Sequence, residues 1–381
     1  MTAPVVVLGA TGSIGEQTLD VAAGLGIEVA GLVARTPSDA FAELALAHPD
    51  ATVVATGGSL DERQAFSATV GERAKFGSEA ALELAATPGA TVVNGIVGAA
   101  GLGASIAALQ AGNRLALANK ESLVAGGPVV VRALESGSGE LIPVDSEHSA
   151  IYQCLQGESE RDVDRLVLTA SGGPFRGKTR DELADVTPEQ ALAHPTWDMG
   201  RRITVDSATL FNKGLEVIEA HFLFGVEYRQ IEVVVHPQSV LHSAVAFVDG
   251  SWKGHFGHAD MKVPIQYALT APDRGPAPGK DFSLAGLQLD FEEPDRQTFR
   301  SLDLAYEAGE MGGSAPAVLN AADEVAVDAF LQGRLGFLGI ADVVAETLER
   351  VEWRELETVG DVVEADAEAR GTAAGLISGA C

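Results

Sequence analysis

The sequence predicts an α/β protein in three parts: a Rossmann-like amino-terminal domain, a central α+β domain with an open sheet and a helical carboxy-terminal domain. Over the first third of the chain, short β-branched runs alternate with Ala- and Leu-rich stretches, which is typical of a parallel sheet with helical crossovers. Near residue 145 this alternation gives way to longer strands and a long helix. From residue 302 to residue 348 helical periodicity dominates. These three observations predict the fold class and the order of its parts.

The individual elements follow from the same patterns. In the first part we expect strands at residues 5–8, 28–33, 52–55, 91–93, 114–118 and 141–144. In the second we expect strands at 165–168, 231–235 and 240–248, the last two paired antiparallel, and a helix over 208–224. Because residues 271–280 are rich in Pro and Gly, regular structure should break there. The expected domains are 1–145, 146–270 and 291–381, with a linker over 271–290.

The composition excludes several classes of protein. The 381 residues include 26 Lys and Arg against 54 Asp and Glu, so the net charge is −28 and no nucleic-acid partner is expected. Cys154 and Cys381 provide neither a disulfide framework nor a thiolate zinc site, which fits a reducing compartment. The start lacks the basic segment of a signal peptide, and glycines interrupt the weakly charged stretch 91–113. We therefore expect a protein without a leader or a membrane span.

A glycine-rich loop follows the first expected strand. Gly9-Ala-Thr-Gly12-Ser-Ile-Gly15 stands between a strand and a helix, where glycines let backbone N–H groups approach a pyrophosphate. Ser13 and Glu16 fit a capping box at the start of that helix. The alternative is a glycine-rich turn without a ligand. After the second strand comes Arg35, with no acid at the position that would bind the ribose of NAD, so the loop is predicted to bind NADP.

Two acids follow the last strand of the first part. Asp145 and Glu147 are two residues apart, which in an extended segment places both carboxylates on one face. Hard oxygen ligands without Cys or paired His favour Mg²⁺ or Mn²⁺ over zinc. The alternative is an acidic turn that is merely solvated.

The helix predicted after residue 206 carries a polar face that favours a ligand. Asn212, Lys213 and Glu216 share that face by their spacing, and Ser207 lies just before it. Ser207, Asn212 and Lys213 would cradle a phosphate, with Ser171 in a turn after a strand as a further hydroxyl, while Glu216 would be a third metal carboxylate. The alternative is a surface Lys–Glu pair beside a Ser/Asp helix cap.

A loop between these two regions contains His194, Trp197 and Met199. Such residues in a loop favour an active-site lid that excludes water, although an aromatic loop anchor fits Trp197 equally well. His242, His255 and His258 have no clear motif, and we assign them no role; the last two are expected to be exposed.

Several of these segments together resemble one enzyme family, 1-deoxy-D-xylulose 5-phosphate reductoisomerase. The resemblance rests on residues 9–15, 118–122, 143–148, 171–176, 194–200, 206–216 and 319–327, in this order along nearly the whole chain. It implies a V-shaped homodimer that uses NADPH and Mg²⁺ or Mn²⁺, with Co²⁺ as a further candidate. The implied reaction rearranges and reduces 1-deoxy-D-xylulose 5-phosphate, a small phosphorylated sugar, to 2-C-methyl-D-erythrose 4-phosphate in the non-mevalonate isoprenoid pathway. Fosmidomycin mimics the substrate in this family, and a bacterial-type cytoplasmic location is implied.

The resemblance also implies roles for individual residues. The metal ligands would be Asp145, Glu147 and Glu216, and Lys120 and Ser146 would lie near the substrate hydroxyls. The phosphate site would comprise Ser171, Ser207, Asn212 and Lys213, and the lid His194, Trp197 and Met199. The cofactor contacts would be Thr11, Gly12, Ser13, Ile14, Asn119, Lys120, Glu121 and Gly200, with Arg35 at the 2′-phosphate. The implied catalytic residues are Lys120, Asp145, Glu147, His194 and Glu216.

The sequence departs from the family pattern at two places. Family members often have Gly-Lys-Asn where this chain has Ala34-Arg35-Thr36, and Asn is frequent where Asp323 stands. Two other functions stay open: an NADP-dependent dehydrogenase of the semialdehyde or homoserine type, and a catalytically silent NADP-binding sensor. The dehydrogenase does not need three carboxylates plus a lid, and a sensor would be expected to have lost Glu147, Glu216 or His194.

Overall fold

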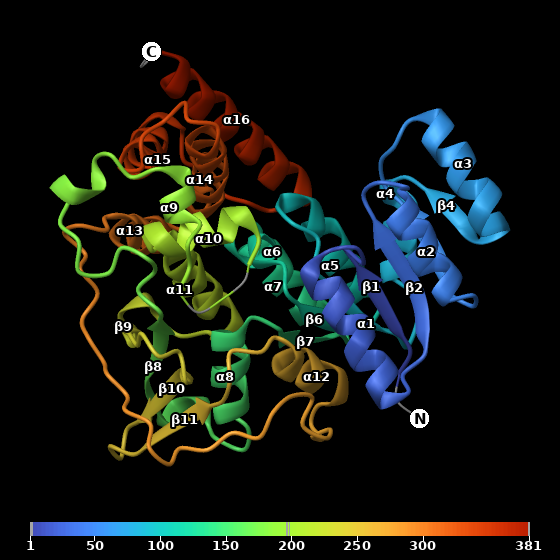
Figure 1. Ribbon diagram of the computed structural model, residues 1–381, viewed down its shortest axis with the longest axis horizontal. Helices are drawn as coiled ribbons and strands as arrows, with labels where there is room; N and C mark the ends of the chain where they lie inside the picture. Colours follow the sequence, from blue (N-terminus) through green and yellow to red (C-terminus); the bar gives the residue numbers. More distant parts are fainter. Residues whose placement is uncertain (1–2, 196, 198, 380–381) are drawn as a thin grey trace. The chain divides into compact units, whose positions relative to one another are not determined.

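The computed structural model describes residues 3–195, 197 and 199–379, and the chain divides into two compact units (Figure 1). The first unit comprises Met1–Ser122, Val129–Ser149 and Asp260–Asp281. The second comprises Leu123–Pro128, Ala150–Ala259 and Phe282–Cys381. Among the described residues, no helix is both long and apolar enough to cross a membrane.

The first unit is built on a parallel sheet. Its described residues form seven strands in the order β4-β3-β2-β1-β5-β6-β7. Their bounds are β1 Val5–Leu8, β2 Val29–Ala34, β3 Thr52–Ala55, β4 Ala74–Phe76, β5 Thr91–Asn94, β6 Arg114–Leu117 and β7 Glu140–Pro143. The strand order reverses between β1 and β5, and in such sheets ligands bind at the carboxyl ends of strands beside that reversal.

Helices join and cover these strands. They are α1 Ser13–Leu25, α2 Asp39–Ala47, α3 Leu60–Val70, α4 Ser78–Ala85, α5 Leu102–Gln110, α7 Gly127–Ser136 and α12 Lys262–Thr270. Two further helices, α6 Lys120–Val124 and α8 Ser146–Cys154, begin in the first unit and end in the second. Helix α12 comes from much later in the sequence, yet it packs on α1, β6 and β7. An ion pair of 2.9 Å between Lys262 and Asp20 links α12 to α1.

The second unit combines a mixed sheet with helices. The sheet has the order β11-β10-β8-β9, with β8 at Val163–Ala170, β9 at Ile231–Val235, β10 at Leu241–Phe247 and β11 at Trp252–Phe256. The helices are α9 Pro188–Ala191, α10 Arg201–Thr209, α11 Phe211–Phe224, α13 Ser301–Met311, α14 Ala315–Leu331, α15 Gly339–Arg350 and α16 Val359–Gly379. Side chains from β8, α11 and α13–α16 share one hydrophobic core.

Two expectations for this unit are wrong. Strands β9 and β10 do not pair with each other in the described sheet, because the long buried strand β8 lies between them, parallel to β9 and antiparallel to β10. The single helix expected over 208–224 is two helices. Leu210, between them, has a left-handed backbone with φ of 65°, which ends α10 and starts α11 in a new direction.

Candidate active site

The glycine loop after β1 forms a helix start suited to an anion. Gly9 has φ of 82°, and a Cβ on Gly15 would clash with the carbonyl oxygen of Gly9, so both positions require glycine. Helix α1 then begins at Ser13 with Gly12 as its N-cap. In the described part of the chain no side chain caps this helix, so the predicted Ser13–Glu16 capping box is wrong. The first N–H groups of α1 therefore remain available to a pyrophosphate.

Arg35 follows the carboxyl end of β2 directly and its side chain is exposed. Its backbone carbonyl accepts a hydrogen bond of 2.7 Å from the Gly57 N–H, which fixes the loop after β2 beside the one after β3. Arg35 thus lies at the strand end where a ribose 2′-phosphate is read in this fold.

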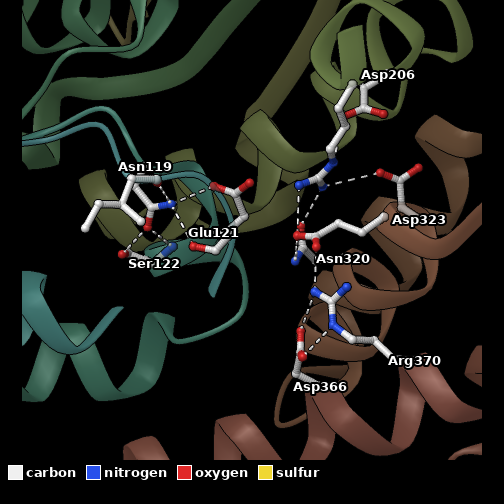
Figure 2. Close-up of polar contacts among 12 residues, drawn as sticks. Asn119, Glu121, Ser122, Asp206, Asn320, Asp323, Asp366 and Arg370 are labelled. Carbon is white, nitrogen blue, oxygen red and sulfur yellow. Dashed lines mark hydrogen bonds and ion pairs between the residues drawn. The ribbon is translucent and has the colours of Figure 1, made fainter. Parts of the chain in front are cut away.

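Asn119 organises the loops after β5 and β6 (Figure 2). Its amide nitrogen donates to the carbonyl oxygens of Ile96 (2.6 Å) and Gly98 (3.0 Å) and to the Glu121 carboxylate (2.8 Å). Its oxygen accepts the Ser122 N–H at 3.0 Å. Since Asn119 is buried and its side chain is fully engaged by these groups, it holds the loop backbone in place rather than offering a free amide.

A further buried asparagine was missed by the sequence reasoning. Asn94, the last residue of β5, donates to the Gly101 carbonyl at 2.9 Å and to Ser105 Oγ at 2.8 Å, and Ser105 in turn contacts Ser122 Oγ at 3.0 Å. An asparagine ending an otherwise apolar buried strand was the available signal. This network supports the same edge of the sheet as Asn119.

The two acids after β7 lie at the start of α8. Asp145 precedes the helix and Glu147 is in its first turn, so the extended conformation expected for them is wrong. They nevertheless stay close, because the Glu147 N–H donates to Asp145 Oδ1 at 3.2 Å. Ser146 Oγ donates to Glu147 Oε2 at 2.6 Å.

Asp145 is also surrounded by two basic side chains. Lys120 Nζ forms an ion pair with Asp145 Oδ2, and Nδ1 of the fully buried His148 is 3.3 Å from Asp145 Oδ1. Lys120 begins α6 shortly after β6 and Asp145 follows β7, so neighbouring strands bring them together. The site has a carboxylate pair with a nearby ammonium, a suitable set for a metal and a polar substrate.

In the second unit, the turn after β8 packs against the end of α10. Gly173 has φ of 66°, and a Cβ there would lie 2.7 Å from the Ser207 carbonyl oxygen. This close approach brings the predicted phosphate ligands Ser171 and Ser207 to the same region. Asn212 and Lys213 follow in the first turn of α11, just after the left-handed Leu210.

Lys213 and Glu216 form a buried ion pair, with side chains only 4% and 1% exposed. Asn212 Nδ2 donates to the other Glu216 oxygen at 2.7 Å. The alternative of a solvent-exposed surface pair is therefore wrong. The helical spacing showed which face the three residues share, but it gave no information on how deep that face lies.

Of the residues predicted to form a lid, His194 contacts Ser171. The Trp197 N–H donates to His194 Nδ1 at 2.9 Å, so the ring proton is on Nε2, which donates to Ser171 Oγ at 3.0 Å. Burial lowers the pKa of His194, which keeps the ring neutral near pH 7. Residues 196 and 198 lie outside the described residues. Met199 is half-buried, and Gly200 is the N-cap of α10.

His242, to which the sequence assigns no role, lies near Trp197. Its ring centroid is 6.4 Å from that of Trp197 and 5.9 Å from that of His255. Burial, followed by the charge of His255, lowers the pKa of His242 to about 4. His255 is half-buried rather than exposed as expected, because it pairs into β11 next to β10, whereas His258 is exposed.

Profiles of known families match successive parts of the chain. One described as 1-deoxy-D-xylulose 5-phosphate reductoisomerase matches residues 5–127, its C-terminal domain matches 141–224, and a DXP reductoisomerase C-terminal domain matches 256–372. The 1-deoxy-D-xylulose 5-phosphate reductoisomerase of Xanthomonas campestris pv. campestris (strain 8004) is 49% identical over 379 residues, covering 97% of this chain and 95% of the relative. The chain belongs to the 1-deoxy-D-xylulose 5-phosphate reductoisomerase family. The reductoisomerase of Pelotomaculum thermopropionicum is 48% identical over 372 residues, or 96% of each chain.

Solved reductoisomerases have the same fold. The enzyme from Zymomonas mobilis in complex with NADPH has a TM-score of 0.91 and 42% identity over 99% of each chain. A DOX-P reductoisomerase in complex with NADPH, fosmidomycin and magnesium has a TM-score of 0.90 and 35% identity, covering 99% of this chain and 98% of that one. The predicted fold class and the predicted NADPH- and metal-dependent reductoisomerase of the isoprenoid pathway are confirmed. The alternative of a semialdehyde or homoserine-type dehydrogenase is wrong.

Proposed function

We propose that this reductoisomerase acts on 1-deoxy-D-xylulose 5-phosphate through the residues predicted from its sequence. The observation that supports this most directly is the position of Lys213. A lysine in the first turn of a helix opposes the helix dipole, and burying it adds a desolvation cost. Such a group is suited to an anionic ligand, and the substrate carries a phosphate.

The divalent cation is assigned to Asp145, Glu147 and Glu216. All three offer carboxylate oxygens, the ligands that Mg²⁺ and Mn²⁺ prefer. Asp145 and Glu216 each pair with a lysine, Lys120 and Lys213, so a positive charge already faces each carboxylate. A bound divalent cation would act as a Lewis acid on the ketone and hydroxyl oxygens of the substrate. We propose that Lys213 exchanges Glu216 for the phosphate and that Lys120 and Ser146 turn to the substrate hydroxyls.

The phosphate is assigned to Ser171, Ser207, Asn212 and Lys213. Gly173 allows the turn that carries Ser171 to pack closely against Ser207, and the first turn of α11 adds backbone N–H groups. Since the phosphate is remote from the reacting carbons, its binding energy can orient them. His194 bonds Ser171, so we propose that phosphate binding orders the lid and that Trp197 and Met199 exclude water from the reaction.

The cofactor is assigned to the edge of the parallel sheet. The pyrophosphate of NADPH would bind at the glycine loop, in contact with Thr11, Gly12, Ser13 and Ile14, and Arg35 would bind the 2′-phosphate. Asn119 and Glu121 would shape the loop that receives the nicotinamide, with Lys120 and Gly200 completing the contacts. NADPH supplies the hydride that reduces the aldehyde.

We further propose that two copies of the chain associate through β11. This strand lies at one edge of its sheet, and Trp252 and Phe256 are 53% and 40% exposed on it. An edge strand offers backbone groups for pairing with another strand, and exposed aromatic side chains favour association. Sedimentation of the wild type and of a Trp252→Lys, Phe256→Lys variant tests this: the first should sediment as a dimer and the second as a monomer.

The named relatives are bacterial, and we propose a cytoplasmic location for this chain.

The decisive experiment follows NADPH oxidation by absorbance with 1-deoxy-D-xylulose 5-phosphate, with and without EDTA. Substrate-dependent oxidation should stop with EDTA and return with Mg²⁺ or Mn²⁺. A silent sensor would bind NADPH without oxidising it when substrate is added. Oxidation that persists in EDTA would contradict the assignment of the three carboxylates.

A further inference from the structure

Arg202 connects the lid to the carboxy-terminal helices. It is the second residue of α10, three positions after the lid residue Met199. Its guanidinium donates to Glu324 Oε1 at 2.8 Å and to Asn320 Oδ1 at 3.0 Å, and it lies 3.5 Å from Asp323 Oδ2. These three partners are at helical spacing on α14, so one side chain fixes α10 against one face of that helix.

The contact is reinforced from both sides. Within α10, Arg202 Nε lies 3.4 Å from the buried carboxylate of Asp206. On the other side, Arg370 from α16 donates to Glu324 Oε2 at 2.5 Å and to Asp366 Oδ2 at 2.7 Å (Figure 2). Helices α10, α14 and α16 are thus joined through the Glu324 carboxylate, which both arginines share.

Such a cluster is a costly way to join helices. Its four carboxylates and two guanidiniums are largely removed from water, and apolar side chains of similar volume often give equal or greater stability. Because the Arg202 guanidinium contacts both Glu324 and Asn320, it defines the position and rotation of α10. Ser207, the proposed phosphate ligand, immediately follows Asp206 on that helix.

We propose that Arg202 is a positioning residue that sets Ser207 and the end of the lid for the substrate phosphate. The inference rests on the proposed role of Ser207. Arg202 does not need to touch the substrate: it holds α10 at one end of the lid, while the bond between His194 and Ser171 holds the other. Together the two anchors limit where the lid closes.

The test compares Arg202→Lys with the wild type and with Arg350→Lys. Arg350 makes an exposed ion pair with Glu346 on α15 and serves as a matched control. Lysine keeps the charge of Arg202 but lacks the rigid, planar fork whose two nitrogens reach Glu324 and Asn320 separately. In Arg202→Lys the Kd for fosmidomycin should rise at least tenfold, whereas the Kd for Mn²⁺ alone should change less than twofold. A purely structural contact would lower the melting temperature and leave fosmidomycin binding by the folded protein unchanged, which would overturn the proposal.

Combining Arg202→Lys with Ser207→Ala tests the route of the effect. If Arg202 acts through Ser207, the double variant should bind fosmidomycin no more weakly than the weaker single variant, and additive losses would refute the route. If Arg202→Lys fails to fold, Glu324→Gln is the second variant. It should weaken fosmidomycin binding less than Arg202→Lys, and combining it with Ser207→Ala should again cause no additional loss. A wild type that does not bind fosmidomycin would instead refute the proposed function.

Discussion

Asp323 gives this chain a pH-dependent stability that an asparagine at the same position would not have. Its carboxyl group is fully buried on α14, and burial raises its pKa to about 6, against an ordinary value of 3.8, although Arg202 opposes the shift. The folded protein therefore retains a proton that the unfolded chain releases. Below about pH 3.8 both states hold the proton, and stability is lost as the pH rises towards 6.

The size of the effect follows from the difference between these two pKa values. About two units at about 1.4 kcal/mol each give roughly 3 kcal/mol. An asparagine in place of Asp323 would carry no charge at any pH, so we expect the stability of Asp323→Asn relative to wild type to increase by about 3 kcal/mol between pH 4 and pH 8. The change should be concentrated between pH 3.8 and 6.

Urea unfolding at a series of pH values, followed by circular dichroism, measures this difference. Asp328→Asn on the same helix is the matched control, because Asp328 is exposed and its removal should alter stability by less than about 0.5 kcal/mol at any pH. A stability difference between Asp323→Asn and wild type that is constant from pH 4 to pH 8 would refute the reasoning. It would mean that Asp323 is ionised throughout and fully compensated by Arg202.

Three further predictions concern the active site. Glu216→Gln should reduce turnover by orders of magnitude and abolish tight Mn²⁺ binding. It should also destabilise the fold by about 3–5 kcal/mol, because Lys213 stays buried without its counter-charge. Near-normal turnover at low Mg²⁺ would contradict the metal role. Arg35→Asp should remove most of the preference for NADPH over NADH in kcat/KM, and equal efficiency with both cofactors in the wild type would exclude this role. Trp197 fluorescence, isolated by comparison with Trp197→Phe, should change when fosmidomycin and metal are added, and Lys213→Ala should abolish that change whereas Arg35→Ala should preserve it. A Trp197 signal that ignores the ligand would reduce the lid to a structural connection.

Much of the parallel sheet could be predicted because its strands are short, buried and bounded by turns. The expected strands at 5–8 and 52–55 coincide with β1 and β3. Strand β11 was missed because Trp-Lys-Gly-His-Phe is short and mostly exposed, and a glycine in its middle disfavours a strand. The order of β8, β9 and β10 could not be read from proximity in sequence, since the partner of a strand depends on which strands can be buried on both sides.

The candidate site was predicted mainly through motifs, which carry no information on its local geometry. Leucine rarely adopts the left-handed conformation, so nothing in the sequence indicated that Leu210 divides the helix. The cluster around Arg202 had one available signal: Asn320, Asp323 and Glu324 are polar residues at helical spacing in a helix that is otherwise apolar apart from Asp328. Recognising their partner required the fold, because Arg202 lies more than a hundred residues earlier in the chain.

The single core shared by β8, α11 and α13–α16 limits how this protein can be divided or recombined. A shortened chain that ends before α13 would expose the apolar faces of β8 and α11, including Leu168, Val217 and Ile218, which are now fully buried. Exposed apolar surface of this kind promotes aggregation. The last helices are therefore not a separable module, and exchanging them between homologues would require a matching α11. We therefore expect α11 and the carboxy-terminal helices to be inherited together.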